Sequence, residues 1–514
     1  MANNRLILRA VSSPWNIPVP DFTKGSVLTH IELDNNLIHL KGEIIHTATT
    51  SSGIVTLHKI NGDQIVFDGS GTVIPEYWVS GASGTNSIKT IGGTNTSTGN
   101  FSVASGKNNT ASGAYSKATN FSNTASANNS TAEGWNTTAS GIAAHSEGQN
   151  TIASGSTSHA EGKATTASGN ASHAEGENTI ASGYASHAEG QSTIASGNTS
   201  HAEGKDTIAS GDYSHAEGSN TESSGNYSHA SGRNTVATGH YSHSEGSGTT
   251  ASGKASHTEG VGTTASGEYS HAQGKDTTAS GLGSHSQGVS TTASGNASNA
   301  NGVNTTASGY VSHAEGYSTM ASGTASHARG QGSTASGIGS TAIGYYTNAA
   351  GAYSHAQGYN TTASGYTSHA QGNNTIANGD YSHAEGYRTT ASGYTSHAEG
   401  SGTTASGNYS HAGGSGTTAS GIASHAEGGG SIASGDYSTA SGYFVTASGD
   451  GSYAGGRGAF NDNTKVIAIG ESSFAHFKYS VDVGSIGARA NFSTILGGVR
   501  QDTNGISSGI FAGE

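Results

Sequence analysis

The sequence predicts an all-β protein: a parallel β-solenoid of fourteen-residue coils, preceded by a small β-rich module. Three observations predict this fold. The chain repeats with a fixed period, small residues alternate within each repeat, and the composition suits neither helices nor a globular core. Of the 514 residues, 81 are Gly and only 4 are Pro, and all four Pro lie within the first 75 positions. Composition alone suggests disorder, but a disordered tract has no strict period.

The period is most visible in the histidines. Steps of fourteen residues from His145 reach a series of slots, and nineteen of them hold His. The same spacing can be followed back to Val103 and forward to Val481, which predicts an unbroken register between these positions. A fixed period indicates structural units that stack on their neighbours. We therefore predict a β-roll shaft over residues 96–485.

Residues 172–185 illustrate one coil, with the sequence Ser-His-Ala-Glu-Gly-Glu-Asn-Thr-Ile-Ala-Ser-Gly-Tyr-Ala. Helix is excluded because Gly, Ser and Thr recur where a helix needs strong formers. Alternation predicts two five-residue strands, 172–176 and 179–183, joined by two-residue connections. In both strands the first, third and fifth residues are small and share one face. His173, Glu175 and the corresponding residues of the second strand point the other way.

Small inward residues predict a very flat coil, because only Gly, Ala, Ser and Thr fit between sheets that lie so close. Glycine also supplies the unusual φ values that the corners need. Successive coils should pair through backbone hydrogen bonds at a spacing of about 4.8 Å. Such a coil buries little apolar area, so we expect one outward face to pack against identical chains in a closed symmetric assembly.

The Ser-x-Ala-x-Gly pattern at this period resembles the head repeats of trimeric autotransporter adhesins (YadA-like heads), which recur in phage tail fibres. The match is closest at Ser102–Gly106, Val466–Gly470 and Ser480–Gly484, where apolar residues fill the His and Glu slots. The resemblance covers about three quarters of the chain. It implies a left-handed parallel β-roll and a homotrimer of three identical chains side by side.

The N-terminal residues 1–95 are not repetitive and are predicted to form a virion-attachment module. Residues 53–60 and 63–68 flank Asn61-Gly62, a pair typical of a tight β-hairpin. The stretch Gly25–Asn36 is similar to the start of phage tail-fibre and other virion proteins, where it docks onto the particle. The resemblance assigns attachment to Gly25, Leu28, Leu33, Asn35 and Asn36.

Residues 486–514 form a third predicted segment near the distal tip. Ser493–Gly498 and Ser508–Gly513 indicate a related but longer β-repeat.

Several functional classes are disfavoured by the sequence. Net charge is −14 with no basic run, which argues against nucleic acid, and no apolar stretch is long enough for membrane insertion. There is no Cys, and no nucleotide-binding, hydrolase or metalloprotease motif, so we expect neither enzymatic activity nor a cofactor.

The first eighteen residues lack the apolar core of a secretory signal, and no coiled-coil heptads of an adhesin stalk are found. These features favour a structural fibre of a bacteriophage virion, an extracellular appendage. The expected partners are baseplate, tail or capsid proteins at the N-terminus and a host cell-surface receptor at the distal end. A bacterial trimeric surface adhesin is the alternative.

The His and Glu slots are the one feature with chemical content. If their face lines the threefold axis, each coil contributes three His and often three Glu, which could bind metal ions. The favoured interpretation is architectural, because His can satisfy polar groups across an interface and a catalytic site is usually made once. Stacked, buried His should have a lowered pKa, so acid should loosen the trimer. The predicted axis ladder comprises His145, His159, His173, His187, His201, His215 and His257 with Glu147, Glu161, Glu175, Glu189, Glu203, Glu217 and Glu259.

Two further surfaces are regular. Thr or Ile followed by Ser on the second strand, as at Thr250 and Ser252, makes an array similar to that of ice-binding solenoids, the third candidate function. Tyr recurs just before the His strand, as at Tyr213 and Tyr381, and is expected at a corner. Packing is its favoured role and carbohydrate binding the alternative.

Overall fold

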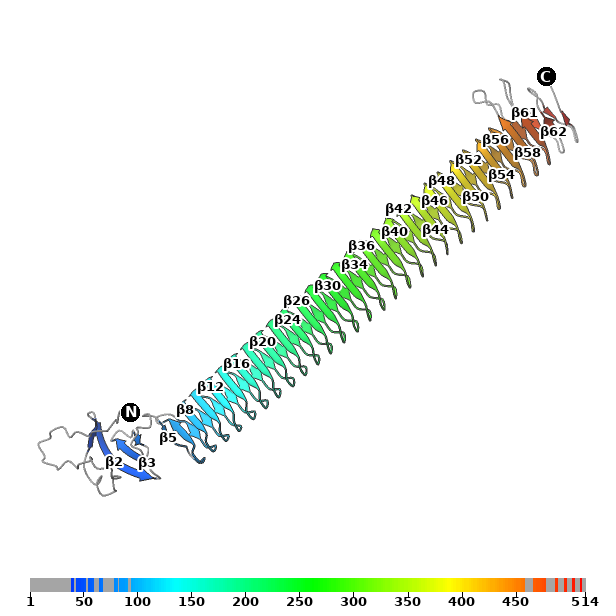
Figure 1. Cartoon of the computed structure of the whole chain (residues 1–514). Coiled ribbons are helices and arrows are strands. Elements are labelled where there is room, and N and C mark those ends of the chain that lie inside the picture. Colours follow the sequence, from blue (N-terminus) through cyan, green and yellow to red (C-terminus); the bar gives the residue numbers. More distant parts are fainter. Residues whose placement is uncertain are drawn as a thin grey trace, which may run out of the picture. The chain divides into compact units, whose positions relative to one another are not determined.

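The structure is a computed structural model. It describes residues 38–40, 43–51, 54–59, 64–67, 78–81, 83–90, 94–457, 466–477, 486–488, 494–496, 502–503 and 509–510. All regular elements in these ranges are β-strands (Figure 1). Within them, no helix has the length and apolar character needed to cross a bilayer. The chain divides into two compact units, residues 1–232 and 233–514, which are described separately.

The first unit begins with a four-stranded antiparallel sheet in the order β1 (Ile38–Leu40), β2 (Glu43–Ser51), β3 (Ile54–Lys59) and β4 (Gln64–Phe67). Strands β3 and β4 pair antiparallel, with Val55 opposite Phe67, so the predicted hairpin is confirmed. The predicted attachment stretch Gly25–Asn36 lies outside the described residues.

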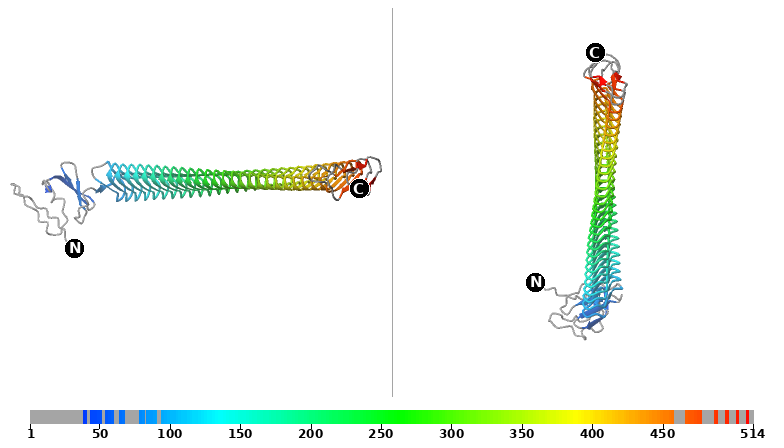
Figure 2. Two further views of the ribbon diagram at one scale, coloured as in Figure 1. Left: turned by 90° about the horizontal axis from the view of Figure 1, so that it is seen from above. Right: turned by 90° about the vertical axis from the view of Figure 1, so that its right-hand side faces the viewer.

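A parallel β-solenoid follows in the first unit (Figures 1 and 2). A short antiparallel pair, β5 (Trp78–Ser80) and β6 (Ile88–Thr90), leads into it, and β6 pairs parallel with β8. Its long strands run from β8 (Val103–Lys107) to β24 (His215–Ser219), each five residues long and starting fourteen residues after the one before. Its short strands run from β7 (Thr96–Ser97) to β25 (Glu222–Ser223), each two residues long. One long and one short strand make a coil, and each strand pairs with the strand fourteen residues away, as His145 does with His159.

The second unit has the same architecture. Its long strands run from β28 (His243–Ser247) to β58 (Tyr453–Arg457), again at intervals of fourteen residues. Its short strands run from β27 (Val236–Ala237) to β55 (Ile432–Ala433), and β57 (Val445–Ala447) continues the series. The described chain thus forms about 26 solenoid turns, which confirms the predicted all-β parallel solenoid. The left-handed winding of the β-roll and the homotrimer stay predictions.

The interior of each coil is as thin as expected. In the coil of residues 172–185, Ser172, Ala174, Thr179, Ala181 and Gly183 are buried. Among the described residues, the largest side chains that are fully buried are two Val near the end of the solenoid, two Asn near its start, and a column of Thr. The predicted restriction to small core residues is therefore confirmed, with its cause in the close approach of the two sheets.

Two details of the predicted coil are wrong. The second strand has two residues, as in β19 (Ile180–Ala181), and not five, because the amides of Ser182 and Gly183 both donate to the carbonyl of Ala195 and the chain turns there. Gly176 is exposed at the other corner and not part of the interior. Its φ of +106° and the Gly190 carbonyl, 2.0 Å from the site of a Cβ, explain why glycine is needed.

The predicted unbroken register from Val103 to Val481 is also wrong. Tyr453 pairs with Phe474, and Ala447 with Ala468, so the interval there is 21 residues. Strand β59 (Val466–Ala468) consequently joins the sheet of short strands, with Ile467 opposite Thr446 and not in a His slot. The physical reason is that both halves of a coil share the x-Ala-x-Gly pattern. Seven extra residues therefore move a segment to the opposite sheet without changing its local pattern.

The last strands continue the stack with longer intervals. Strands β61 (Ile486–Ala488) and β63 (Asp502–Thr503) extend the short-strand sheet, and β62 (Thr494–Leu496) and β64 (Gly509–Ile510) follow β60 (Phe474–Phe477) in the long-strand sheet. Thr494 pairs with Gly509, an interval of fifteen residues, which agrees with the predicted longer repeat. The predicted match at Ser480–Gly484 lies outside the described residues.

Candidate functional site: the His/Glu face

The candidate site is the outward face of the long strands, here called the His/Glu face. Alternation along each strand turns His173 and Glu175 outward while Ala174 enters the core. Parallel pairing in exact register then places each His and each Glu beside its equivalent in the next coil. All fourteen predicted ladder residues lie in these two columns. Six His/Glu pairs belong to the first unit, and His257 and Glu259 belong to the second.

The imidazole rings form a continuous stack in the first unit. From His145 to His229, neighbouring ring centroids are 4.7–4.8 Å apart and the ring planes differ by no more than 8°. In the second unit the stack is less regular: His271 and His285 are tilted by 42°, and His313 and His327 meet edge to face at 82°. The predicted stacking is confirmed, and its spacing is that of the β-ladder itself.

Each Glu lies beside the His of its own coil. The distance from His Nε2 to Glu Oε2 is 3.6 Å for His145, His159 and His173, which is beyond a normal hydrogen bond. These His side chains are between 34% and 40% exposed, yet their Nε2 atoms are covered and have no hydrogen-bond partner within the described part of this single chain. The same holds for Nε2 of His187 and His201. A covered polar atom without a partner is costly, so these Nε2 atoms are an unsatisfied feature of the single chain.

Partial burial also controls protonation of the ladder. Loss of solvent lowers the pKa of His173, His187, His201 and His215 below the usual value, and the charge of the His in the preceding coil lowers it further. Nearby Glu carboxylates oppose this shift but do not overcome it. In the second unit, burial and neighbouring His lower the pKa of His257 in the same way. The predicted lowering is therefore confirmed for these residues.

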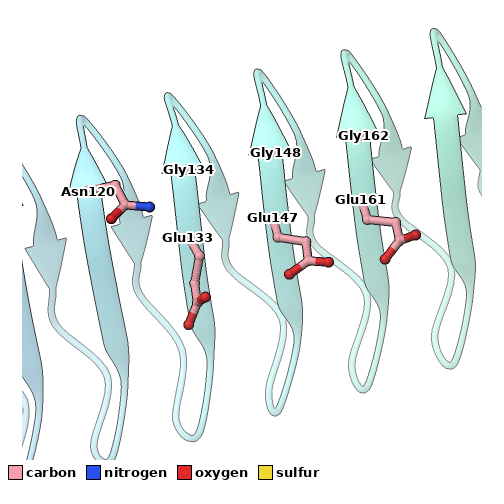
Figure 3. Close-up of a pocket in the computed structure, with 7 residues that line it drawn as sticks. All are labelled: Asn120, Glu133, Gly134, Glu147, Gly148, Glu161 and Gly162. Atoms are coloured by element: carbon pink, nitrogen blue, oxygen red, sulfur yellow. The ribbon is translucent and has the colours of Figure 1, made fainter.

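The Glu column borders a shallow open groove in the first unit, with a volume of about 370 Å³. Figure 3 shows Glu133, Glu147 and Glu161 in a row on successive strands, and Asn120, on the strand before them, lies in register with Gly134 and the other glycines. Carboxylates at the spacing of the β-ladder repel one another, so the groove favours cations over anions.

Metal binding was the alternative role of this face. Groups such as His159, Glu161 and His173 place one ligand atom each within 4.8 Å of the others. A bound zinc ion needs ligand nitrogens about 2.0–2.1 Å from the metal, on converging directions. Stacked rings that are nearly parallel point their in-plane nitrogens side by side instead. The parallel rings of the first unit therefore do not present a preformed chelating site, and the architectural interpretation stays favoured.

A second ladder, which was not predicted from the sequence, is formed by Asn and Asp at the corner before the long strand. The Oδ1 of Asn198 accepts the amide of Tyr184 at 3.2 Å, and the Oδ1 of Asp212 accepts the amide of Asn198 at 2.9 Å. Each such side chain binds a backbone amide of the preceding coil that the turn leaves outside the sheet. The recurrence of Asn and Asp at this slot was visible in the sequence as a signal.

A buried ladder at the start of the solenoid was missed as well. The side-chain amide of Asn109 donates to the carbonyls of Ser105 and Asn120, at 2.6 and 2.8 Å. Its Oδ1 accepts the amide of Asn123 at 2.8 Å. Thr137 and the Thr of later coils occupy the same slot, so three Asn, beginning with Asn95, mark only the first coils.

The other two predicted surfaces are where they were expected. Tyr213 and Tyr381 lie at the corner before the long strand, exposed and with φ of 56° and 57°. Thr250 and Ser252 lie on the outward side of the short-strand sheet, half-buried and exposed respectively.

Comparison with protein families finds the YadA head domain repeat along the solenoid, over residues 160–186, 188–214, 230–256, 259–284, 286–312, 314–337, 335–354, 356–382 and 384–410. Among curated proteins, no match was found. The family match confirms the resemblance inferred from the Ser-x-Ala-x-Gly pattern: YadA head domain repeats are found across residues 160–410, with residues 215–229 outside the matched ranges.

Proposed function

From the YadA head domain repeats found across residues 160–410, we propose that this chain is a structural fibre protein that assembles as a homotrimer through its His/Glu face. The repeats indicate a fold of the trimeric adhesin or fibre type, and repeats of this kind usually form homotrimers. One observation carries the choice of face: the covered His Nε2 atoms, which lack partners in a single chain. If the imidazole rings rotate toward an identical chain packed on this face, that chain can supply partners in the coils where Nε2 lacks one.

The proposal can be tested by native mass spectrometry of the purified chain. A trimer of 50.9 kDa subunits is expected. Replacing His187 and His201 by Lys places permanent charges on the His/Glu face and should dissociate the trimer. The matched control replaces Ile194 and Ile208, on the short-strand face of the same coils, by Lys and should leave it intact. A monomeric wild-type chain contradicts the homotrimer, and dissociation by the control pair alone contradicts the assigned face.

We further propose that the fibre belongs to a bacteriophage virion. The support is the similarity of Gly25–Asn36 to docking segments of virion proteins, at the end of the chain that carries the separate antiparallel sheet β1–β4. The sheet and the preceding residues are then the module that binds baseplate, tail or capsid proteins, and the opposite end of the chain faces the host receptor. A bacterial trimeric surface adhesin fits the head repeats equally well.

Mass spectrometry of purified virions and of outer-surface fractions of cells separates these two assignments. Peptides of the chain in purified particles support the fibre, and peptides confined to the cell surface support the adhesin.

Ice binding is the third candidate. Five consecutive coils, beginning with Thr250/Ser252 and ending with Thr306/Ser308, carry an uninterrupted Thr/Ser array, but Glu222 and Met320 interrupt it elsewhere. Thermal hysteresis of the purified chain tests this directly.

A further inference from the structure

A ridge of five Tyr side chains follows one corner of the second unit, beside strands β44 (His355–Tyr359) to β52 (His411–Ser415). Two adjacent residue positions in this corner can carry Tyr, and in successive coils Tyr occupies first one and then the other. Tyr353, Tyr381 and Tyr409 occupy one position, and Tyr366 and Tyr394 occupy the other. Each ring contacts the ring of the next coil.

Ring geometry makes this ridge a continuous surface. Neighbouring centroids are 5.4–5.8 Å apart and neighbouring planes differ by 74–86°, an edge-to-face series. The five side chains stay between 42% and 59% exposed. Three of them, Tyr353, Tyr381 and Tyr409, have φ near +57°, a conformation that costs free energy for a side chain with a Cβ. Ala or Gly at the same slot in other coils, as at Ala423 and Gly283, shows that the solenoid does not need Tyr there.

The chemistry of the ridge points to one class of ligand. Tyr presents an apolar ring face and a polar hydroxyl, which match the C–H faces and hydroxyl edge of a pyranose ring. Residues 353–409 contain no Lys and one Arg, Arg388, which lies over the ring of Tyr387 near the other corner. Phosphate-rich polymers such as nucleic acids therefore find no Lys or Arg of these coils beside the ridge.

The shape of the Tyr ridge restricts the class of ligand further. Small ligands bind in concave pockets that bury most of their surface, and a row of rings along an edge offers none. An extended polymer can instead contact several rings at once, and the rings of each corner position recur every second coil, at about 10 Å. The turns beneath are held by side chains that the ligand does not need to displace: Asp380 and Asn408 accept the amides of Tyr366 and Tyr394 at 2.8 and 3.0 Å.

We propose that this Tyr ridge binds an extended, uncharged polysaccharide along the shaft. The proposal goes beyond the structural role and holds whether a virion or a cell carries the fibre. It places a glycan contact on the side of the repeat region, in addition to any receptor at the distal end.

The test is native affinity electrophoresis of the full chain in gels that contain a soluble neutral polysaccharide: hydroxyethyl cellulose, xylan, mannan or laminarin. Retardation by at least one of these gels is expected, and dextran sulfate should cause none. Replacing Tyr366 and Tyr394 by Asn, the residue at the same slot in position 408, should weaken binding about twenty- to thirtyfold, or about fivefold for each ring. The matched control replaces Tyr213 and Tyr227, a stacked pair at the same corner of the first unit, by Ala and should not change the binding.

Oligomeric mass is measured for every variant. Unretarded wild-type chain in all four neutral gels, equal binding by the Tyr366/Tyr394 variant, or dissociation of that variant's oligomer each overturns the proposal. The last outcome assigns the ridge to contacts between chains.

Discussion

Two glycines in one corner of the second unit allow the packing argument to be tested within three residues of chain. Gly281 is buried, and a Cβ there would lie 2.0 Å from the carbonyl oxygen of Gly295 in the next coil. Gly283 is exposed with φ of +61°, and a Cβ there would meet nothing within 4 Å. We expect Gly281→Ala to be severely destabilising and Gly283→Ala to be nearly neutral.

The magnitude follows from the hydrogen bonds at this corner. Real Cβ atoms do not come closer than about 3.0 Å, so the coils must separate locally by about 1 Å. This separation lengthens three bonds, those from the amides of Ser280 and Gly281 to Ala293 O and from Leu282 N to Asn296 Oδ1. At about 1 kcal/mol each, plus about 1–3 kcal/mol for overpacking, the cost is about 4–6 kcal/mol. For Gly283→Ala, a left-handed Ala costs about 1 kcal/mol, and the lower entropy of the unfolded chain offsets most of it.

The assay is hydrogen exchange followed by mass spectrometry, because a long solenoid need not unfold in one step. Peptides that cover residues 270–296 should exchange about a thousandfold faster or more in Gly281→Ala, and within about fivefold of wild type in Gly283→Ala. Equal protection of the two variants would refute the inference that contact between coils requires glycine at position 281.

Three other perturbations test separate features. Acid should destabilise the solenoid and its assembly, because burial lowers the pKa of His173, His187, His201 and His215 and the unfolded chain therefore takes up protons first. This contribution to stability is complete above pH 6.5 and falls as the pH drops below 6.5 through the lowered pKa. A titration from pH 8 to 4 that shows no change in native mass or circular dichroism contradicts this. Val311 has a β-branched side chain at φ of 53°, a strained backbone conformation, so Val311→Gly should stabilise its coil by about 1 kcal/mol. Hydrogen exchange measures this, and slower exchange in the wild type than in the variant would contradict the strain at Val311. Asn109→Ala removes three hydrogen bonds, one buried and two partly buried, and should cost about 2–4 kcal/mol at the start of the solenoid. Asn109→Thr, the residue of later coils, should cost less, and equal exchange rates of the two variants would contradict the role of the amide.

Much of this fold could be predicted because the same alternation of residue types recurs in each coil. The alternation around His173 identified the outward slots, and the small residues around Ala174 identified the interior. Positions at the corners were harder. Gly176 lies within the long strand but faces out because its φ of +106° interrupts the alternation, and the need for glycine there comes from the Gly190 carbonyl of the neighbouring coil.

The site shows the same division. The His and Glu columns could be predicted from the sequence. The lowered pKa of His173 could be predicted as well, because stacking places the ring beside a neighbouring charge and partly buries it. The hydrogen bonds from backbone amides to Asn198 and Asp212 could not be predicted, because the turn geometry of the preceding coil decides which amides lie outside the sheet.

By itself, the sequence determined the fourteen-residue period, the flat core of Ala, Ser, Thr and Gly, and the identity of the outward columns, because each depends on residue size and alternation within one coil. Only the tertiary structure decided which sheet a segment joins. Val466–Ala468 matches either half of a coil by pattern, and its pairing with Val445–Ala447 across 21 residues assigns it to the short strands. Local pattern sets which side of a strand faces inward, whereas the choice between two similar sheets depends on the length of chain between neighbouring coils.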